Sequence, residues 1–355
     1  MSRRRLLALL AFLVLGGGVA TAALVGTGGG PGSPAATAPP TAAGPTVAAG
    51  PTATGPSSAQ RPRVRRQGTP AAKPAGKPAQ VGPGAARELA IGIGDQNAGA
   101  LDAPAFRALG LRHARLIVPY DAMAVGYERG LLAAWFAAAA RAGVEPFVTF
   151  GHSRERPERL PTVAEYGRAV TAFRRAYPQV RTFAPWNEIN HRSQPTAGDP
   201  ARAAAFYDAL VARCRGCTVV AGDLLDQSGM LSYLRRYRAA LRRPARLWGL
   251  HNYSDTNRFR ASGTRAFLAA VPGDVWLTET GGIFRFGRAF PASQRRQARA
   301  IDWTLRLAGR ERRVQRVYLY NWTGAPADAR FDAGLVDAEG RPRRALGVLR
   351  AALQR

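Results

Sequence analysis

Histidine and cysteine are scarce in this sequence, and their placement argues against a metal site. The four histidines are scattered along the chain, at His113, His152, His191 and His251. Zinc sites need closely spaced ligand pairs, which these residues do not provide. The two cysteines form a C-x-x-C motif, Cys214 to Cys217, that follows a helical pattern and enters a strand pattern. This order differs from that of a redox motif, so the cysteines are expected to form a local disulfide or remain free thiols.

Acidic residues are few, and lysine is absent after Lys77. The net charge is +28; residues 1–87 hold ten basic residues and no acid, and the remainder holds 41 arginines against 23 acids. These arginines are spread over every helical pattern and form no run interleaved with aromatic residues, which argues against a nucleic-acid surface. The basic surface could instead favour an acidic polysaccharide.

Nucleotide-binding loops are missing as well. The segment Gly92-Ile-Gly94 begins like a dinucleotide fingerprint, but it lacks the third glycine, and no phosphate-binding loop occurs elsewhere. We therefore predict a protein without cofactor or metal and without a nucleic-acid partner.

The long apolar run is confined to the N-terminus. It extends from Leu6 to Val25, follows three arginines at 3–5 and contains a small-residue cleavage pattern, Ala20-Thr-Ala22. This layout is typical of a secretory signal. A run of about 20 residues is also long enough to span a bilayer, so a retained anchor is the alternative. In either case residues 1–25 would direct the rest of the chain out of the cytoplasm, and the membrane would be a partner only if the segment is retained.

Residues 26–86 consist mainly of proline, alanine, glycine and threonine. Such a segment buries too little apolar surface to offset the entropy lost on ordering, so it is predicted to be a disordered linker. Its basic residues are Arg61, Arg63, Arg65, Arg66, Lys73 and Lys77. They could contact anionic envelope polymers, although a solvated linker is the simpler interpretation.

Residues 87–355 show a regular alternation of strand and helix patterns. Eight short apolar runs lie near 89–93, 112–118, 145–150, 181–186, 217–221, 247–251, 274–278 and 315–320. Helical patterns separate them; one opens with a capping box at Thr162, and another with Asp199 ahead of Pro200. Alternating strands and helices indicate a parallel sheet, and eight units of this size predict a closed (β/α)8 TIM barrel. A doubly wound open sheet is the alternative.

Two glutamates occupy matching places in this pattern. Glu188 follows the fourth apolar run in Trp-Asn-Glu, and Glu279 follows the seventh, 91 residues later. The active site of such a barrel lies where the strands end, and strands four and seven lie across its mouth. The two carboxylates are thus expected to face each other, as in glycoside cleavage. A separation of about 5–5.5 Å would indicate a retaining mechanism and one of about 6.5–9.5 Å an inverting mechanism.

With these motifs in order, residues 88–355 resemble the clan A glycoside hydrolases, which are retaining (β/α)8 enzymes with cellulase-like and xylosidase-like branches. The resemblance rests on Trp186-Asn187-Glu188 and Thr278-Glu279, with support from Arg115, His251-x-Tyr253, Trp322 and a hairpin-like segment at 334–342. It implies a secreted or extracytoplasmic enzyme that hydrolyses O-glycosidic bonds of a poly- or oligosaccharide.

The resemblance also implies a role for each matching residue. Glu188 would be the general acid/base and Glu279 the nucleophile, while Asn187 would bond the sugar 2-hydroxyl. Arg115 and Tyr253 would bond Glu279, and Trp322 would form an apolar floor under the sugar. His152 and His251 would contact the substrate. Asp95 and Asp223 are interpreted as ordinary loop acids. A glycan-binding barrel that has lost turnover is the alternative function.

Overall fold

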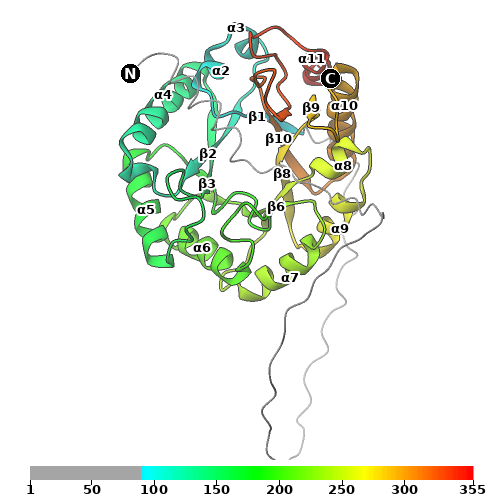
Figure 1. The fold of residues 1–355 in the computed structure, drawn as a ribbon. Coiled ribbons are helices and arrows are strands. Elements are labelled where there is room, and N and C mark those ends of the chain that lie inside the picture. The colour runs from blue at the N-terminus through cyan, green and yellow to red at the C-terminus, as the bar shows by residue number, and fades with distance from the viewer. Residues whose placement is uncertain (1–88, 355) are drawn as a thin grey trace, which may run out of the picture. The chain divides into compact units, whose positions relative to one another are not determined.

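The computed structural model describes residues 89–354, which form a barrel of parallel strands surrounded by helices (Figure 1). The predicted (β/α)8 architecture is confirmed. The predicted signal or anchor at 1–25 and the predicted linker at 26–86 lie outside the described residues. Within the described range, no helix has both the length and the apolar character needed to cross a membrane.

Nine β-strands make up the barrel wall. In sheet order they are β5 (Thr218–Val219), β4 (Thr182–Ala184), β3 (Glu145–Gly151), β2 (His113–Pro119), β1 (Ala90–Gly94), β10 (Val314–Tyr320), β8 (Asp274–Thr280), β7 (Leu247–His251) and β6 (Ala221–Leu225). All neighbouring pairs are parallel. The carboxyl ends of the strands therefore meet at one mouth, as expected for this architecture.

Helices cover the outside of the wall (Figure 1). They are α2 (Ala98–Asp102), α3 (Pro104–Arg107), α4 (Gly126–Ala142), α5 (Val163–Ala176), α6 (Pro200–Arg213), α7 (Met230–Ala240), α8 (Tyr253–Asn257), α9 (Ser262–Ala270), α10 (Gln294–Arg310) and α11 (Arg344–Leu353), with a 3-10 turn, η1, at Ala122–Ala124. The predicted helix starts are present: Thr162 and Glu165 form a capping box on α5, and Asp199 caps α6 ahead of Pro200.

The fifth barrel strand differs from its predicted form. The sequence indicated one strand at 217–221, whereas the structure has β5 paired with β4 and β6 paired with β7, separated by Val220. The pairing of β6 shifts register after Gly222, whose φ of +83° is favourable only for glycine. This irregularity extends the strand to Leu225 and brings Asp223 into the barrel wall.

Two short antiparallel β contacts lie in the C-terminal half of the chain. β9 (Arg285–Phe286) pairs antiparallel with β11 (Phe331–Asp332), a contact that the strand pattern did not predict. The hairpin expected at 334–342 is present as an antiparallel bridge between Val336 and Pro342, and α11 follows it.

Aromatic side chains fill the barrel interior below its mouth. Phe147, Trp276 and Tyr318 form one buried cluster, with ring centroids of Phe147 5.8 Å from Trp276 and 5.2 Å from Tyr318. The guanidinium of Arg115 lies 5.8 Å from the centroid of Phe147. The polar groups near the strand ends therefore lie against a layer of packed aromatic side chains.

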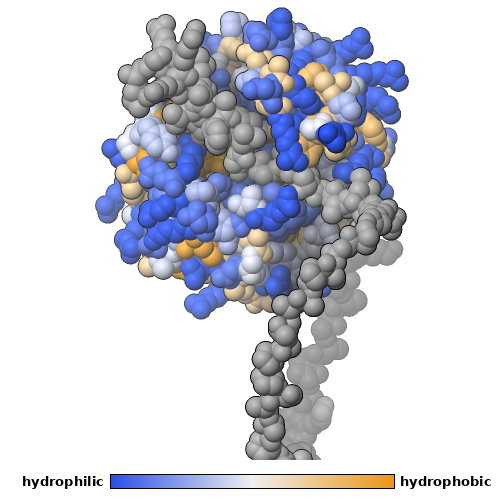
Figure 2. Space-filling model, viewed as in Figure 1, coloured by the Kyte–Doolittle hydropathy of each residue, from blue (hydrophilic) through white to orange (hydrophobic). Residues whose placement is uncertain are grey.

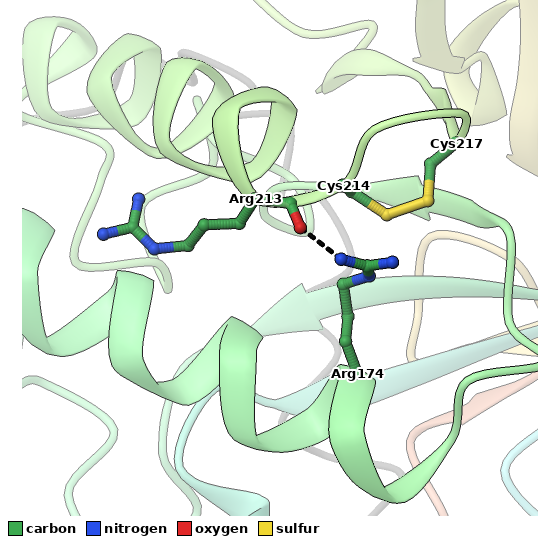
Figure 3. Close-up of a disulfide and its surroundings, with 4 residues drawn as sticks. All are labelled: Arg174, Arg213, Cys214 and Cys217. Carbon is green, nitrogen blue, oxygen red and sulfur yellow. Dashed lines mark hydrogen bonds between the residues drawn. A yellow bond between two sulfur atoms is a disulfide. The ribbon is translucent and has the colours of Figure 1, made fainter.

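A disulfide joins Cys214 and Cys217 directly after α6 (Figure 3). Beside it, Arg174 of α5 donates a hydrogen bond to the carbonyl of Arg213 at the end of α6. The bridge and the arginine together hold the turn between α6 and β5. This is the structural clip that the sequence allowed. The viewed face of the described residues is largely hydrophilic, with scattered apolar side chains (Figure 2).

Candidate active site

The backbone around Glu188 is fixed by its two neighbouring strands. The Asn187 amide donates to the carbonyl of Phe150 in β3 at 2.7 Å, and the Ile189 amide donates to Asp223 in β6 at 3.2 Å. Between these two bonds the chain bends at Glu188 itself, which has a φ of +44°. A left-handed conformation at a non-glycine residue is uncommon and concentrates at functional sites.

Both carboxylate oxygens of Glu279 accept hydrogen bonds. Arg115 Nη1 donates to Oε2 at 2.6 Å, and the Tyr253 hydroxyl donates to Oε1 at 3.0 Å. Burial and the neighbouring Glu279 charge raise the pKa of Tyr253 well above its usual value, so this residue remains a donor. A cation and a hydroxyl donor beside a carboxylate both favour its charged form.

Arg115 is the hub of the site and is only 1% exposed. Its Nη2 donates to Asn187 at 2.8 Å and to Asp223 at 2.9 Å, and its Nε donates to Thr149 at 3.1 Å. Burial alone would lower the pKa of Arg115, but Asp223 and Glu279 outweigh it and raise the pKa. Arg115 thereby connects β2, β3, β6 and β8 inside the barrel.

His251 connects Glu188 to the same network. It is fully buried, with Nδ1 3.3 Å from Glu188 Oε1 and Nε2 3.7 Å from Asp223 Oδ2. Burial alone would lower the pKa of His251, but the charges of Glu279, Asp223 and Glu188 raise it to about 9. With this pKa the imidazole is expected to be protonated at neutral pH; its Nδ1 faces Glu188, and its Nε2 faces Asp223 and, at 3.4 Å, Nη2 of Arg115.

Glu188 and Glu279 meet across the barrel. One ligand oxygen from each lies within 4.8 Å of the other and of a His251 ring nitrogen. Glu188 Oε1 faces His251, whereas Oε2 is buried without a hydrogen-bond partner among the described residues. Burial raises the pKa of Glu188; the His251 hydrogen bond opposes this rise, and the charge of Glu279 adds to it. The two carboxylates thus differ in their partners: Arg115 and Tyr253 bind both oxygens of Glu279, whereas Glu188 has His251 at Oε1 only.

No family model matches the sequence, and no curated protein matches it. Solved structures do match the fold. A GH5_18 protein from Streptomyces cattleya, solved with GlcNAc, has 17% identity and a TM-score of 0.57 over 76% of this chain and 81% of that one. A GH39 β-xylosidase from Caulobacter crescentus has 16% identity and a TM-score of 0.56 over 75% and 71%.

A GH2 β-galacturonidase from Eisenbergiella tayi matches at 13% identity and a TM-score of 0.51, over 76% of this chain and 51% of that one. These proteins are clan A glycoside hydrolases. The chain shares the (β/α)8 barrel fold of these proteins. At such low identities the match concerns the fold, so the activity must be argued from the residues.

The remaining predicted site residues differ in their burial and in their contacts. Asn187 is 4% exposed beside Arg115, at the expected place. His152 follows β3 at the mouth and is partly exposed. Trp322 is 3% exposed and packs edge-on against Phe106 of α3, with centroids 5.5 Å apart, as part of the main core.

Residues beyond the predicted set also contribute to the site. Asp223 is fully buried between Arg115 and His251, not a loop acid. Burial alone would raise the pKa of Asp223, but Arg115 and His251 lower it. Tyr320 at the end of β10 packs with Tyr253 in a second apolar cluster, and its phenol pKa is raised by burial and by the charge of Glu279.

Asp95 has a structural task at the same mouth. Its Oδ2 accepts hydrogen bonds from the amides of Trp322 at 3.0 Å and Thr323 at 2.8 Å, and Oδ1 accepts one from Asn97 at 2.7 Å. Burial raises the pKa of Asp95 to about 6 despite these bonds. The carboxylate therefore joins the end of β1 to the end of β10.

The raised pKa of His251 predicts a loss of stability in mildly alkaline solution. A histidine with a folded pKa of about 9 stabilises the fold fully below its ordinary value of 6.5 and loses that contribution as the pH rises to 9. The free energy of unfolding should fall by up to about 3 kcal/mol over this interval. Urea unfolding at pH 6.5, 7.5 and 9 measures the decline. A His251→Asn variant should lack it; an equal decline in that variant would rule out His251 as its source.

Proposed function

We propose that this protein is an exported retaining glycoside hydrolase that cleaves O-glycosidic bonds in a poly- or oligosaccharide. The observation that carries the proposal is the pairing of Glu188 and Glu279, with oxygens within 4.8 Å. Two carboxylates that approach this closely support a double displacement, in which the carboxyl groups lie about 5–5.5 Å apart, over inversion, which needs about 6.5–9.5 Å.

In the first step, Glu279 attacks the anomeric carbon and forms a glycosyl ester. Glu188 donates its proton to the leaving oxygen, so the alcohol departs neutral. Two features support this assignment: Arg115 and Tyr253 hold both oxygens of Glu279, and Oε2 of Glu188 accepts no hydrogen bond among residues 89–354, with His191 Nδ1 3.9 Å away. A nucleophile should remain charged, and an acid should keep its proton until the bond breaks.

In the second step, water hydrolyses the ester with Glu188 as the base. Once Glu279 is esterified, it no longer carries a negative charge, and its contribution to the raised pKa of Glu188 disappears. Glu188 then accepts a proton from water more readily, and the sugar leaves with its original anomeric configuration. Asn187, held by Arg115, is placed to bond the sugar 2-hydroxyl through its amide nitrogen.

Tyr320 is a better candidate than Trp322 for the aromatic surface under the sugar. Tyr320 is partly exposed and lies in the cluster that contains Tyr253, whereas Trp322 packs in the main core against Phe106. We also propose substrate contacts by His152 at the mouth. His251 serves mainly to hold Glu188, since its ring is fully buried.

Replacing Glu188 with glutamine tests the proposed acid. For aryl β-glycosides with a strongly acidic dinitrophenol, bond cleavage needs little proton transfer, so kcat/KM should stay near the wild-type value while kcat falls with slower deglycosylation. For weakly acidic phenols, kcat/KM should fall by about 10²–10⁴-fold. Steady-state kinetics over a panel of aryl glycosides measures the difference.

Two outcomes would contradict this function. Equal losses of kcat/KM on both kinds of phenol would exclude Glu188 as the acid. An inactive wild-type protein that still binds sugars across the panel would favour the glycan-binding barrel instead. The substitution Glu339→Gln, at an exposed position, controls for loss of a carboxylate elsewhere.

The proposed export rests on the sequence of residues 1–25, with the linker at 26–86 as a tether that could contact anionic envelope polymers. The Cys214–Cys217 disulfide supports an oxidising location, because such bonds persist mainly outside the cytoplasm. We also propose that the segments 189–199, after the fourth strand, and 282–293, after β8, determine substrate specificity.

A further inference from the structure

A basic groove lies on the outside of the barrel, away from the two glutamates. It has a volume of about 550 Å³ and runs between α9 and α10. Its lining residues are Phe259, Arg260, Ala261, Arg265, Arg299, Asp302, Trp303, Arg306, Leu307 and Arg310. Half of these residues are arginines and only one is acidic, so the groove is a concentrated site of positive charge.

Part of this charge is not neutralised by neighbouring acids. Arg306 forms an ion pair with Asp302, and Arg265 pairs with Glu311 at 2.8 Å. Arg299 and Arg310 are both exposed, and neither forms an ion pair with an acid among residues 89–354. Exposed arginines without an acidic partner present their planar donor groups to a ligand anion.

Two aromatic rings lie between these arginines. Phe259 and Trp303 pack edge-on with centroids 6.3 Å apart, and both are partly exposed. Arg299 lies 4.7 Å above the Phe259 ring. Phe259 has a φ of +54°, a strained conformation for a bulky residue, and its place in the groove depends on that bend.

The arrangement along α10 continues the same surface. Arg299, Trp303, Arg306 and Arg310 are spaced by four, three and four residues, which places them along one face of the helix. The groove therefore offers cations at intervals around an aromatic centre, over a length that suits a chain ligand better than a single ion.

We propose that this groove binds a segment of an anionic polysaccharide. The guanidinium groups of Arg299 and Arg310 contact carboxylate or phosphate groups of the chain, and Trp303 contacts the apolar faces of its sugar rings, while Phe259 lies under Arg299. The choice of a polysaccharide over other polyanions rests on the proposed function and export. The binding itself is independent of catalysis, because Glu188 and Glu279 take no part in the groove.

The test measures binding of the full chain to soluble polygalacturonate at low salt by affinity electrophoresis. The groove variant is Arg299→Gln with Arg310→Gln. A matched control replaces Arg168 and Arg175, two exposed arginines on α5, with glutamine and removes the same charge elsewhere. We expect the groove variant to bind about tenfold more weakly and the control to bind within about twofold of wild type.

A second pair of variants tests the aromatic contact. Trp303→Ala should weaken binding, and Trp303→Phe should restore most of it, because a ring still covers the sugar face. A neutral glucan should not retard any variant. Turnover of a small aryl glycoside should be unchanged in all of them, so failure of the groove and failure of the active site are told apart.

Three results would overturn the proposal. Absence of binding to polygalacturonate is one, and equal weakening in the groove variant and the α5 control is another, since it would show a general effect of charge. Tighter binding of a single-stranded DNA oligonucleotide that depends on Arg299 and Arg310 would assign the groove to a different polyanion.

Discussion

Replacing Glu279 with glutamine should lower kcat/KM on an activated aryl glycoside by at least about 10³-fold, because the substitution removes the proposed nucleophile. The amide retains the shape of the carboxylate and can still accept from Arg115, so the fold should persist. Sugar binding, measured by calorimetry with the monosaccharide product, should change little. Thermal unfolding of both proteins checks that the barrel is intact.

A smaller variant strengthens this test. In Glu279→Ala, the lost side chain leaves space beside the anomeric carbon, and added azide should restore turnover and give a glycosyl azide of inverted configuration. Product analysis by NMR reads the configuration directly. Retained activity in Glu279→Gln, or a rescued product of unchanged configuration, would remove Glu279 as the nucleophile.

Replacing Arg115 with methionine should destabilise the fold by about 3–5 kcal/mol at pH 7. The substitution keeps an unbranched side chain over Phe147 but leaves the carboxylates of Asp223 and Glu279 buried without their cation. Urea unfolding monitored by tryptophan fluorescence gives the difference. The deficit should shrink toward acidic pH, because protonation of the two carboxyl groups removes the unpaired charge.

An exposed arginine provides the comparison for this variant. Arg107 pairs with Asp102 at 2.8 Å, with side chains 45% and 36% exposed. Arg107→Met should cost less than about 1 kcal/mol, because water solvates the remaining acid. Similar losses in the two variants would mean that Arg115 contributes no more than a surface residue and that the network around it is not essential.

The sequence predicted the barrel because each strand and helix carries its own local signal. Apolar runs at regular spacing, the capping box at Thr162 and the Asp199-Pro200 helix start are all visible without tertiary information. The position of a polar residue at a strand end then follows from parallel topology alone. This reasoning placed Glu188 and Glu279 at the same mouth.

Other site features depend on contacts that no local pattern encodes. Asp223 was interpreted as a loop acid, since the bulge that extends the fifth strand gives no sequence signal beyond Gly222. One indirect signal exists at Gly249 on β7: a Cβ there would lie 2.2 Å from Asp223 Oδ1, so this glycine makes room for the carboxylate. Its meaning is clear only after the strands are paired.

The sequence also does not show which of the two aromatic residues near the last strand faces the site. Tyr320 and Trp322 are two residues apart, and a strand pattern places both on the same face. The chain leaves β10 after Tyr320, so the alternation no longer applies, and Trp322 packs into the core against Phe106. The path of the loop after β10 decides which of the two rings packs in the core. A loop has no side-chain periodicity from which this could be predicted.

The bend at Glu188 has an energetic consequence for how such a protein can change over time. A left-handed backbone at a residue other than glycine costs about 1–2 kcal/mol, which the hydrogen bonds of Asn187 and Ile189 must offset. Glycine at this position would relieve that strain while removing the proposed acid. Selection for stability alone would therefore favour glycine at this position and lead to a more stable but inactive barrel. The glutamate would be kept only under selection for the proposed activity.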